Sequence, residues 1–192
     1  MQVQSVQAGQ VTIQNAGSSK IYGLDLDGSY AATDRLSLRG GVSFLHARFD
    51  SFPNAAINVP NPVCPAGYPF CGNITVTRDI SGTPLERAPD KTAFLSATYD
   101  VPTSYGTVSA QATGSYNSGF LWTFGDVFKQ GPYALLNAQL TWASPDTHLK
   151  LSLWGRNLTD RVYGVAHGIG NPSAGIAWAS PRTAGVSADY GF

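Results

Sequence analysis

Residues 107–117 read TVSAQATGSYN, and their side chains alternate strictly between two kinds. One set is apolar or small and comprises Val108, Ala110, Ala112, Gly114 and Tyr116. The other set is polar and comprises Ser109, Gln111, Thr113, Ser115 and Asn117. Successive side chains of a β-strand point to opposite faces of the sheet. The stretch therefore predicts a strand with one apolar face and one polar face.

The same alternation recurs on both sides of this stretch, with a break at Phe94. It predicts further strands at 21–30, 35–44, 91–101, 135–142, 149–157 and 180–192, and an N-terminal hairpin of about 2–8 and 11–22. The connections alternate between short ones at 31–35, 101–106 and 143–148 and long ones at 51–88, 118–131 and 159–181. An all-β antiparallel meander of about eight strands then has its short turns at one end and its long loops at the other.

Composition narrows the class of protein. The chain has 192 residues, a formal net charge of +0 and 12% charged residues, which is about half the usual share for soluble domains. Mean hydropathy is −0.08, and no apolar run reaches the length of about 18 residues that indicates a transmembrane helix. Low charge without high hydropathy is typical of a membrane β-barrel, because lipid-facing and polar residues cancel in the average. The neutral chain has no basic block, so we expect no nucleic-acid partner.

Aromatic residues fall at both ends of the predicted apolar faces. The short-turn end carries Tyr30, Tyr99, Trp142 and Tyr190, and the long-loop end carries Tyr22, Phe44 and Tyr116. Two aromatic rings that bound an aliphatic band are the girdles expected at the two membrane–water interfaces. A soluble β-sandwich is the alternative, but its core would need bulkier side chains than Ala110, Ala112 and Gly114, and it gives no reason for girdles. We therefore interpret the chain as a transmembrane β-barrel segment.

Four stretches, in this order, resemble a known family. They are NAGSSKIYGLDLD (15–27), LERAPDKT (85–92), GRNLTDRVY (155–163) and the terminal SADYGF (187–192). Together they are similar to the C-terminal third of TonB-dependent receptors, which are outer-membrane transporters of Gram-negative bacteria. The resemblance implies a cell outer membrane location and the uptake of siderophores or similar large nutrients. It also implies a barrel of about 22 strands in the complete family, plugged by an N-terminal domain.

The chain departs from the complete family pattern. Neither a plug domain nor an energy-coupling box is visible, and the chain starts within an alternating pattern rather than with a signal peptide. We therefore expect residues 1–192 to form a single barrel segment that is not active alone. The expected partners are outer-membrane lipid, the missing N-terminal barrel and plug, and, only through that plug, the inner-membrane energy-coupling protein.

An isolated arc leaves two unpaired edges, which a membrane core does not tolerate. The alternative is a small closed eight-stranded outer-membrane barrel with a structural or adhesive role.

Two cysteines, Cys64 and Cys71, lie in the long loop at 51–88, which we expect to be extracellular. We predict that they form a disulfide, because the cell exterior is oxidising. A metal site is disfavoured, since two cysteines alone cannot complete a tetrahedral shell and no histidine is near in sequence. No metal or other cofactor is expected.

The chain also lacks a nucleophile–base pair, paired carboxylates and a phosphate loop with convincing spacing, so we predict that it is not an enzyme.

Six charged residues fall on the predicted polar faces: Asp25, Asp27, Arg39, Lys150, Arg156 and Asp189. We interpret them as a lumen wall whose charges pair across neighbouring strands. A translocation path is the functional alternative. The three histidines, His46, His148 and His167, are scattered over different segments and are interpreted as lone surface or loop residues.

The final strand ends on Tyr190 and Phe192, in phase with the apolar face. We predict that Phe192 belongs to the girdle at the short-turn rim. The resemblance implies that these residues are also an outer-membrane assembly signal. In that role, the barrel assembly machinery would engage the final strand by backbone pairing.

Overall fold

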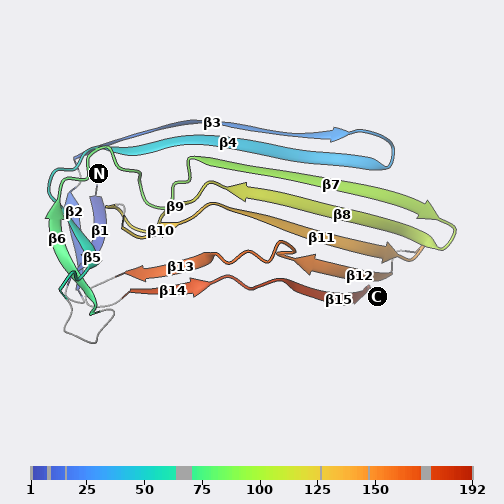
Figure 1. The fold of residues 1–192 in the computed structure, drawn as a ribbon. Coiled ribbons are helices and arrows are strands. Elements are labelled where there is room, and N and C mark those ends of the chain that lie inside the picture. Colours follow the sequence, from blue (N-terminus) through green and yellow to red (C-terminus); the bar gives the residue numbers. More distant parts are fainter. Residues whose placement is uncertain are drawn as a thin grey trace.

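The main element of the computed structural model is a seven-stranded antiparallel sheet in the order β15-β12-β11-β8-β7-β4-β3 (Figure 1). The structure describes residues 2–7, 10–15, 17–63, 71–125, 127–146, 148–169 and 174–191. The seven strands are β3 (Ser18–Ala31), β4 (Leu36–Ser51), β7 (Lys91–Thr103), β8 (Gly106–Asn117), β11 (Tyr133–Ala143), β12 (Leu149–Arg156) and β15 (Thr183–Tyr190). Strands that are neighbours in the sheet follow one another in the chain, so the sheet is a meander.

Four two-stranded hairpins accompany the sheet. They are β1 (Gln2–Gln7) with β2 (Gln10–Asn15), β5 (Ala55–Pro60) with β6 (Asn73–Arg78), β9 (Phe120–Leu121) with β10 (Lys129–Gln130), and β13 (Gly164–Ile169) with β14 (Ala174–Trp178). Figure 1 shows them towards the end of the sheet that lies opposite the short turns. In the described part of the chain, no helix is long and apolar enough to span a membrane.

The predicted strands are confirmed with small shifts at their ends, but the long connections are not simple loops. Each of the three segments at 51–88, 118–131 and 159–181 contains strand residues. The predicted strand at 35–44 also continues to Ser51. Its alternation changes phase after Phe44: the residues that become buried, Ala47 and Phe49, lie on the face opposite Phe44. A search for one continuous apolar face therefore ends the strand too early.

The phase change has a physical cause at the loop end. Ala47 and Phe49 belong to a cluster of buried residues that also contains Phe52, Ala55, Ile57, Ile80, Leu85 and Phe124. The ring centroids of Phe49 and Phe52 lie 5.3 Å apart, and those of Phe49 and Phe124 lie 6.3 Å apart. Fully burying a side chain of this size stabilises by about 1.5–3 kcal/mol. The cluster joins the end of β4 to the β5–β6 hairpin and to the segment after β9.

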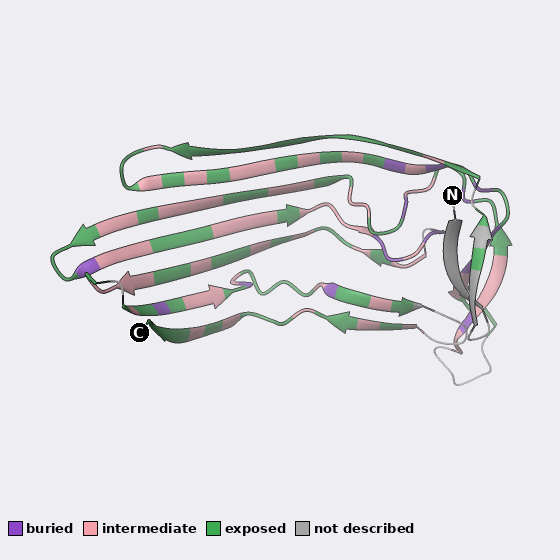
Figure 2. Cartoon of the chain, turned by 180° about the vertical axis from the view of Figure 1, so that it is seen from behind, coloured by how far each residue is buried: buried purple, intermediate pink, exposed green. Residues whose placement is uncertain are grey.

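Among the described residues, nothing covers the apolar face of the seven-stranded sheet along most of its length. Large apolar side chains stay exposed along one face, for example Leu95 at 60%, Leu153 at 56% and Val186 at 80%. Figure 2 shows the contrast: most buried residues gather towards the hairpin end, and the long strands are striped with exposed and intermediate residues. Soluble monomers rarely expose a continuous apolar surface of this extent.

The sheet is open. Its outer strands are β3 and β15, and the two do not pair with each other. The segment at 11–22 was predicted as one arm of a hairpin, but residues 10–15 pair with β1, and a separate strand starts at Ser18. The described sheet therefore has seven strands rather than about eight. It has the open form expected for an arc of a larger barrel, not that of a small closed eight-stranded barrel.

Candidate functional site

The polar face of the sheet carries the six charged residues predicted for a lumen wall. In the β3–β4 ladder, Leu24 lies opposite Phe44 and Leu26 opposite Val42, so these pairs share the apolar face. Asp25 and Asp27 alternate with them and point to the other side. Lys150 and Asp189 lie directly opposite each other on β12 and β15. Arg39 and Arg156 face uncharged neighbours, Ser96 on β7 and Thr183 on β15.

Among these six charges, only the Lys150–Asp189 pair is brought face to face by the register. The ion pairs of the described residues lie elsewhere, at the hairpin end of the sheet: Lys20 with Asp50 at 2.8 Å, and Arg48 with Asp90 at 2.9 Å. The interpretation of a wall with charges paired across strands therefore has one candidate pair in register, and it stays a prediction.

Hydroxyl and amide groups form most of the remaining polar face. The Oγ of Ser96 lies 2.9 Å from Oγ1 of Thr113 across β7 and β8, and the amide of Gln111 donates to the same Ser96 at 3.4 Å. Between β11 and β12, Thr141 and Ser152 are joined at 2.9 Å. The face thus resembles a hydrated wall more than a core, because its polar groups bond to one another across the strands.

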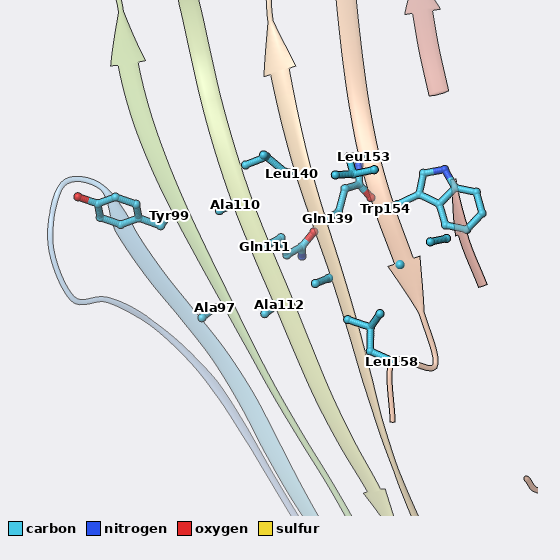
Figure 3. Close-up of a pocket in the computed structure, with 13 residues that line it drawn as sticks. Ala97, Tyr99, Ala110, Gln111, Ala112, Gln139, Leu140, Leu153, Trp154 and Leu158 are labelled. Carbon is cyan, nitrogen blue, oxygen red and sulfur yellow. The ribbon is translucent and has the colours of Figure 1, made fainter. Parts of the chain in front are cut away.

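The apolar face is hollowed along a row of small residues (Figure 3). The ladders place one such residue on each of five successive strands: Ala97, Ala112, Ala138, Gly155 and Ala184. Larger side chains, among them Tyr99, Leu140 and Leu153, flank the row, and the groove has a volume of about 590 Å³. At one end, Leu158 folds back over Gly155, where an added Cβ would lie 2.7 Å from its Cδ2.

Asn157 organises the turn that follows β12. Its side chain is buried, with 6% exposed, and the residue has a φ of 49°, which asparagine tolerates better than most residues. Its Oδ1 accepts from the N–H of Arg161 at 2.9 Å, and its Nδ2 donates to the carbonyl groups of Arg161 and Ser180 at 2.9 and 3.2 Å. In the sequence, Asn157 is only one residue of the GRNLTDRVY stretch, and no local pattern predicts its structural role.

A second group that sequence reasoning missed lies at the hairpin end. His167 on β13 packs against Trp122 and Phe128, with ring centroids 5.8 and 5.2 Å apart, and the guanidinium of Arg87 lies 5.8 Å from the Trp122 ring. Nε1 of Trp122 and Nδ1 of His167 are buried without a hydrogen-bond partner. Burial lowers the pKa of His167 from its ordinary value. The members are far apart in sequence, so no local pattern could reveal the cluster.

The predictions for the C-terminal aromatic residues and for the two cysteines each involve one described residue and one residue outside the described part of the chain. Tyr190 lies opposite Leu149 at the end of β15 and is 63% exposed, in phase with the apolar face as predicted. Cys71 has its Sγ 3.4 Å from the carbonyl oxygen of Val63. Phe192 and Cys64 lie outside the described residues. The assembly signal and the disulfide therefore stay predictions.

Comparisons with known proteins agree with this geometry. A family model described as the TonB dependent receptor-like β-barrel matches residues 1–158. No curated protein matches the chain.

Several solved structures share the fold. The ferric yersiniabactin uptake receptor FyuA from Yersinia pestis is 18% identical with a TM-score of 0.72, and the match covers 94% of this chain and 25% of that one. The siderophore receptor PiuA from Acinetobacter baumannii is 20% identical with a TM-score of 0.65, over 97% of this chain and 23% of that one. The ferric preacinetobactin receptor BauA from the same species is 16% identical with a TM-score of 0.65, over 98% and 25%. The chain thus spans about a quarter of the length of these relatives.

Proposed function

The chain belongs to the TonB-dependent receptor β-barrel family, and from this premise we propose that it is the C-terminal barrel part of a receptor that takes up siderophores or similar large nutrients. Members of this family are outer-membrane β-barrel proteins of Gram-negative bacteria, and they are transport receptors rather than enzymes. The observation that carries the proposal is the open meander with one uncovered apolar face and one polar face. The named solved relatives are siderophore receptors, which supports the ligand class.

In this function, the apolar face contacts lipid and the polar face lines the lumen. Strands of a membrane barrel alternate between apolar side chains that face lipid and polar side chains that face inward. The exposure of Leu95, Leu153 and Val186 then has a reason, because lipid covers them. The charges at Asp25, Asp27, Arg39, Lys150, Arg156 and Asp189 point away from lipid, where an unpaired charge is costly.

The segment needs further polypeptide to act. The outer strands β3 and β15 leave backbone donors and acceptors without a strand partner, and these are costly in a lipid core. We propose that additional barrel strands complete both edges, and that a plug couples the barrel to the inner-membrane energy-coupling protein. We further propose that the barrel assembly machinery recognises the final strand through its backbone and through Tyr190 and Phe192.

The test is iron uptake in the cells that carry the gene. Deletion of the whole gene should abolish uptake of radiolabelled iron from at least one ferric siderophore in a panel. The complete gene should restore it, and a gene that encodes only residues 1–192 should not. Unchanged uptake from every siderophore in the panel would contradict the ligand class, and rescue by residues 1–192 alone would contradict the incomplete barrel.

A further inference from the structure

The polar face contains a hollow of about 290 Å³ beside β8, β11, β12 and β15. Its lining includes Asn137 on β11, Trp154 and Arg156 on β12, and Thr113 on β8. No aspartate or glutamate lines it in the described part of the chain. The hollow therefore contains the positive charge of Arg156 and no carboxylate that neutralises it.

The ring of Trp154 contacts the guanidinium of Arg156. The guanidinium carbon of Arg156 lies 5.5 Å from the centre of the Trp154 ring, within the range of a cation–π contact. The indole is itself supported, because it lies against the backbone of Gly185. Within the described residues, the guanidinium of Arg156 takes part in no ion pair and donates no hydrogen bond to another protein group. Its guanidinium donors therefore remain available beside the Trp154 ring.

The orientation of the Asn137 side-chain amide follows from the hydrogen bond that it makes with a described residue. The backbone N–H of Asn157 donates to Asn137 at 2.9 Å, and a donor must meet the amide oxygen rather than its nitrogen. The NH₂ group of Asn137 is therefore the part of the amide that can donate a hydrogen bond to a ligand. The two glutamines in the same lining are already engaged, since Gln111 donates to Ser96 and Gln139 donates to Thr141.

We propose that Arg156 and Asn137 form a binding site for a carboxylate group. A guanidinium presents two parallel N–H donors that match the two oxygens of a carboxylate, and the Asn137 amide can donate to one of those oxygens from a second side. The proposal rests on the proposed function only in placing this face inside a barrel. The carboxylate can come from a free solute or from an aspartate or glutamate side chain of polypeptide inside the barrel, and the experiment separates the two sources.

The experiment uses the full-length protein purified from outer membranes in detergent. The first measurement is calorimetric titration with acetate and with succinate. The second places a photo-reactive benzoylphenylalanine at position 113, within the hollow, and identifies cross-linked peptides by mass spectrometry. The variants are R156Q and N137D, and the control is R39Q, on the same polar face but outside the lining. N137D keeps the oxygen that accepts from Asn157 but replaces the donor with a negative charge.

Binding of acetate or succinate that weakens about tenfold in R156Q and N137D, but not in R39Q, supports a free carboxylate. A cross-linked peptide that contains aspartate or glutamate, and whose yield falls about tenfold in R156Q, supports a side-chain carboxylate. The absence of both results, or an equal effect of R39Q, overturns the site. Because neither measurement uses siderophore uptake, the site can fail while the proposed function stands, and the reverse also holds.

Discussion

The indole of Trp154 occupies the space that a side chain at Gly185 would need on the neighbouring strand. The two residues lie directly opposite each other in the β12–β15 ladder, and a Cβ built on Gly185 would lie 2.5 Å from the indole. The absence of a side chain at residue 185 thus lets a large aromatic ring pack against the backbone of β15 on the polar face. The same ring supports Arg156.

A side chain at position 185 should therefore destabilise the barrel. We expect G185V to lower the free energy of unfolding by about 1–3 kcal/mol, the usual cost of overpacking. The measurement is urea unfolding of the full-length protein refolded into lipid vesicles. G114V is the matched control, because it adds the same side chain at a glycine whose Cβ would meet nothing within 4 Å. Equal losses in the two variants would show that the Trp154 contact is not the cause.

Removal of the Asn157 side chain should loosen the turn after β12. N157G keeps the positive φ but removes the partly buried hydrogen bonds from the Asn157 side chain to the carbonyl groups of Arg161 and Ser180. We expect a loss of about 1–3 kcal/mol in unfolding free energy, because each lost hydrogen bond typically contributes about 0.5–1.5 kcal/mol. Hydrogen exchange of residues 157–161 should also accelerate. Unchanged exchange in N157G would argue against a structural role, and N117G, which alters a different asparagine, serves as the comparison.

His167 should make the hairpin end less stable in acid. Burial lowers the pKa of its imidazole in the folded state, so the unfolded state binds the proton more readily. The contribution of neutral His167 is therefore fully present above the unfolded pKa, about 6.5, and is lost as the pH falls from there towards the lower folded value.

The measurement for His167 is protease cleavage of the β13–β14 hairpin between pH 8 and pH 5. Cleavage should increase in the wild-type protein as the pH falls, and H167F should flatten this dependence. H148Q is the control and should retain the dependence, since His167 is still present. A flat profile in the wild-type protein would contradict the role of His167.

Nitroxide labels should distinguish the two faces of β8. Labels at Ala110 or Ala112 should collide with oxygen dissolved in lipid, and labels at Gln111 or Thr113 should collide with a water-soluble nickel chelate. The physical reason is that adjacent residues of a strand point to opposite faces. The measurement is paramagnetic relaxation of the full-length protein in bilayers, and each labelled position controls for its neighbour. The reverse accessibility pattern would refute the lipid-facing assignment.

Deletion of Phe192 should affect assembly in cells more than folding in detergent. If the assembly machinery engages the final strand, loss of the terminal aromatic should slow insertion strongly in cells, with refolding of the purified barrel almost unchanged. If Phe192 only anchors the rim, its deletion should impair insertion in cells and refolding in detergent to the same extent, because both lose about 1–3 kcal/mol of apolar burial. The measurement compares insertion kinetics in the two settings in the full-length protein, with Y190A as a second variant on the same face.

The sequence by itself determined the fold class, the two faces and most of the long strands. Alternation with a period of two follows from the local geometry of an extended chain, so TVSAQATGSYN predicts β8 without knowledge of its neighbours. The side of the sheet on which Asp25 or Arg156 lies follows from the same local geometry. The aromatic residues at both strand ends were visible for the same reason, whereas the family resemblance came from four sequence stretches taken in order.

The tertiary structure alone decided which of these residues meet. The register of the ladders put Trp154 opposite Gly185 and Lys150 opposite Asp189, and register depends on pairing between distant segments. The bond from Asn157 to Asn137, and the packing of His167 on Trp122, join residues that are 20 and 45 positions apart. The end of β4 was placed too early because β4 changes its buried face at the end of the sheet. The hairpins within the long connections were missed because their strands are short and pair outside the seven-stranded sheet. No local period carries such information, since it arises only when separate segments of the chain pack together.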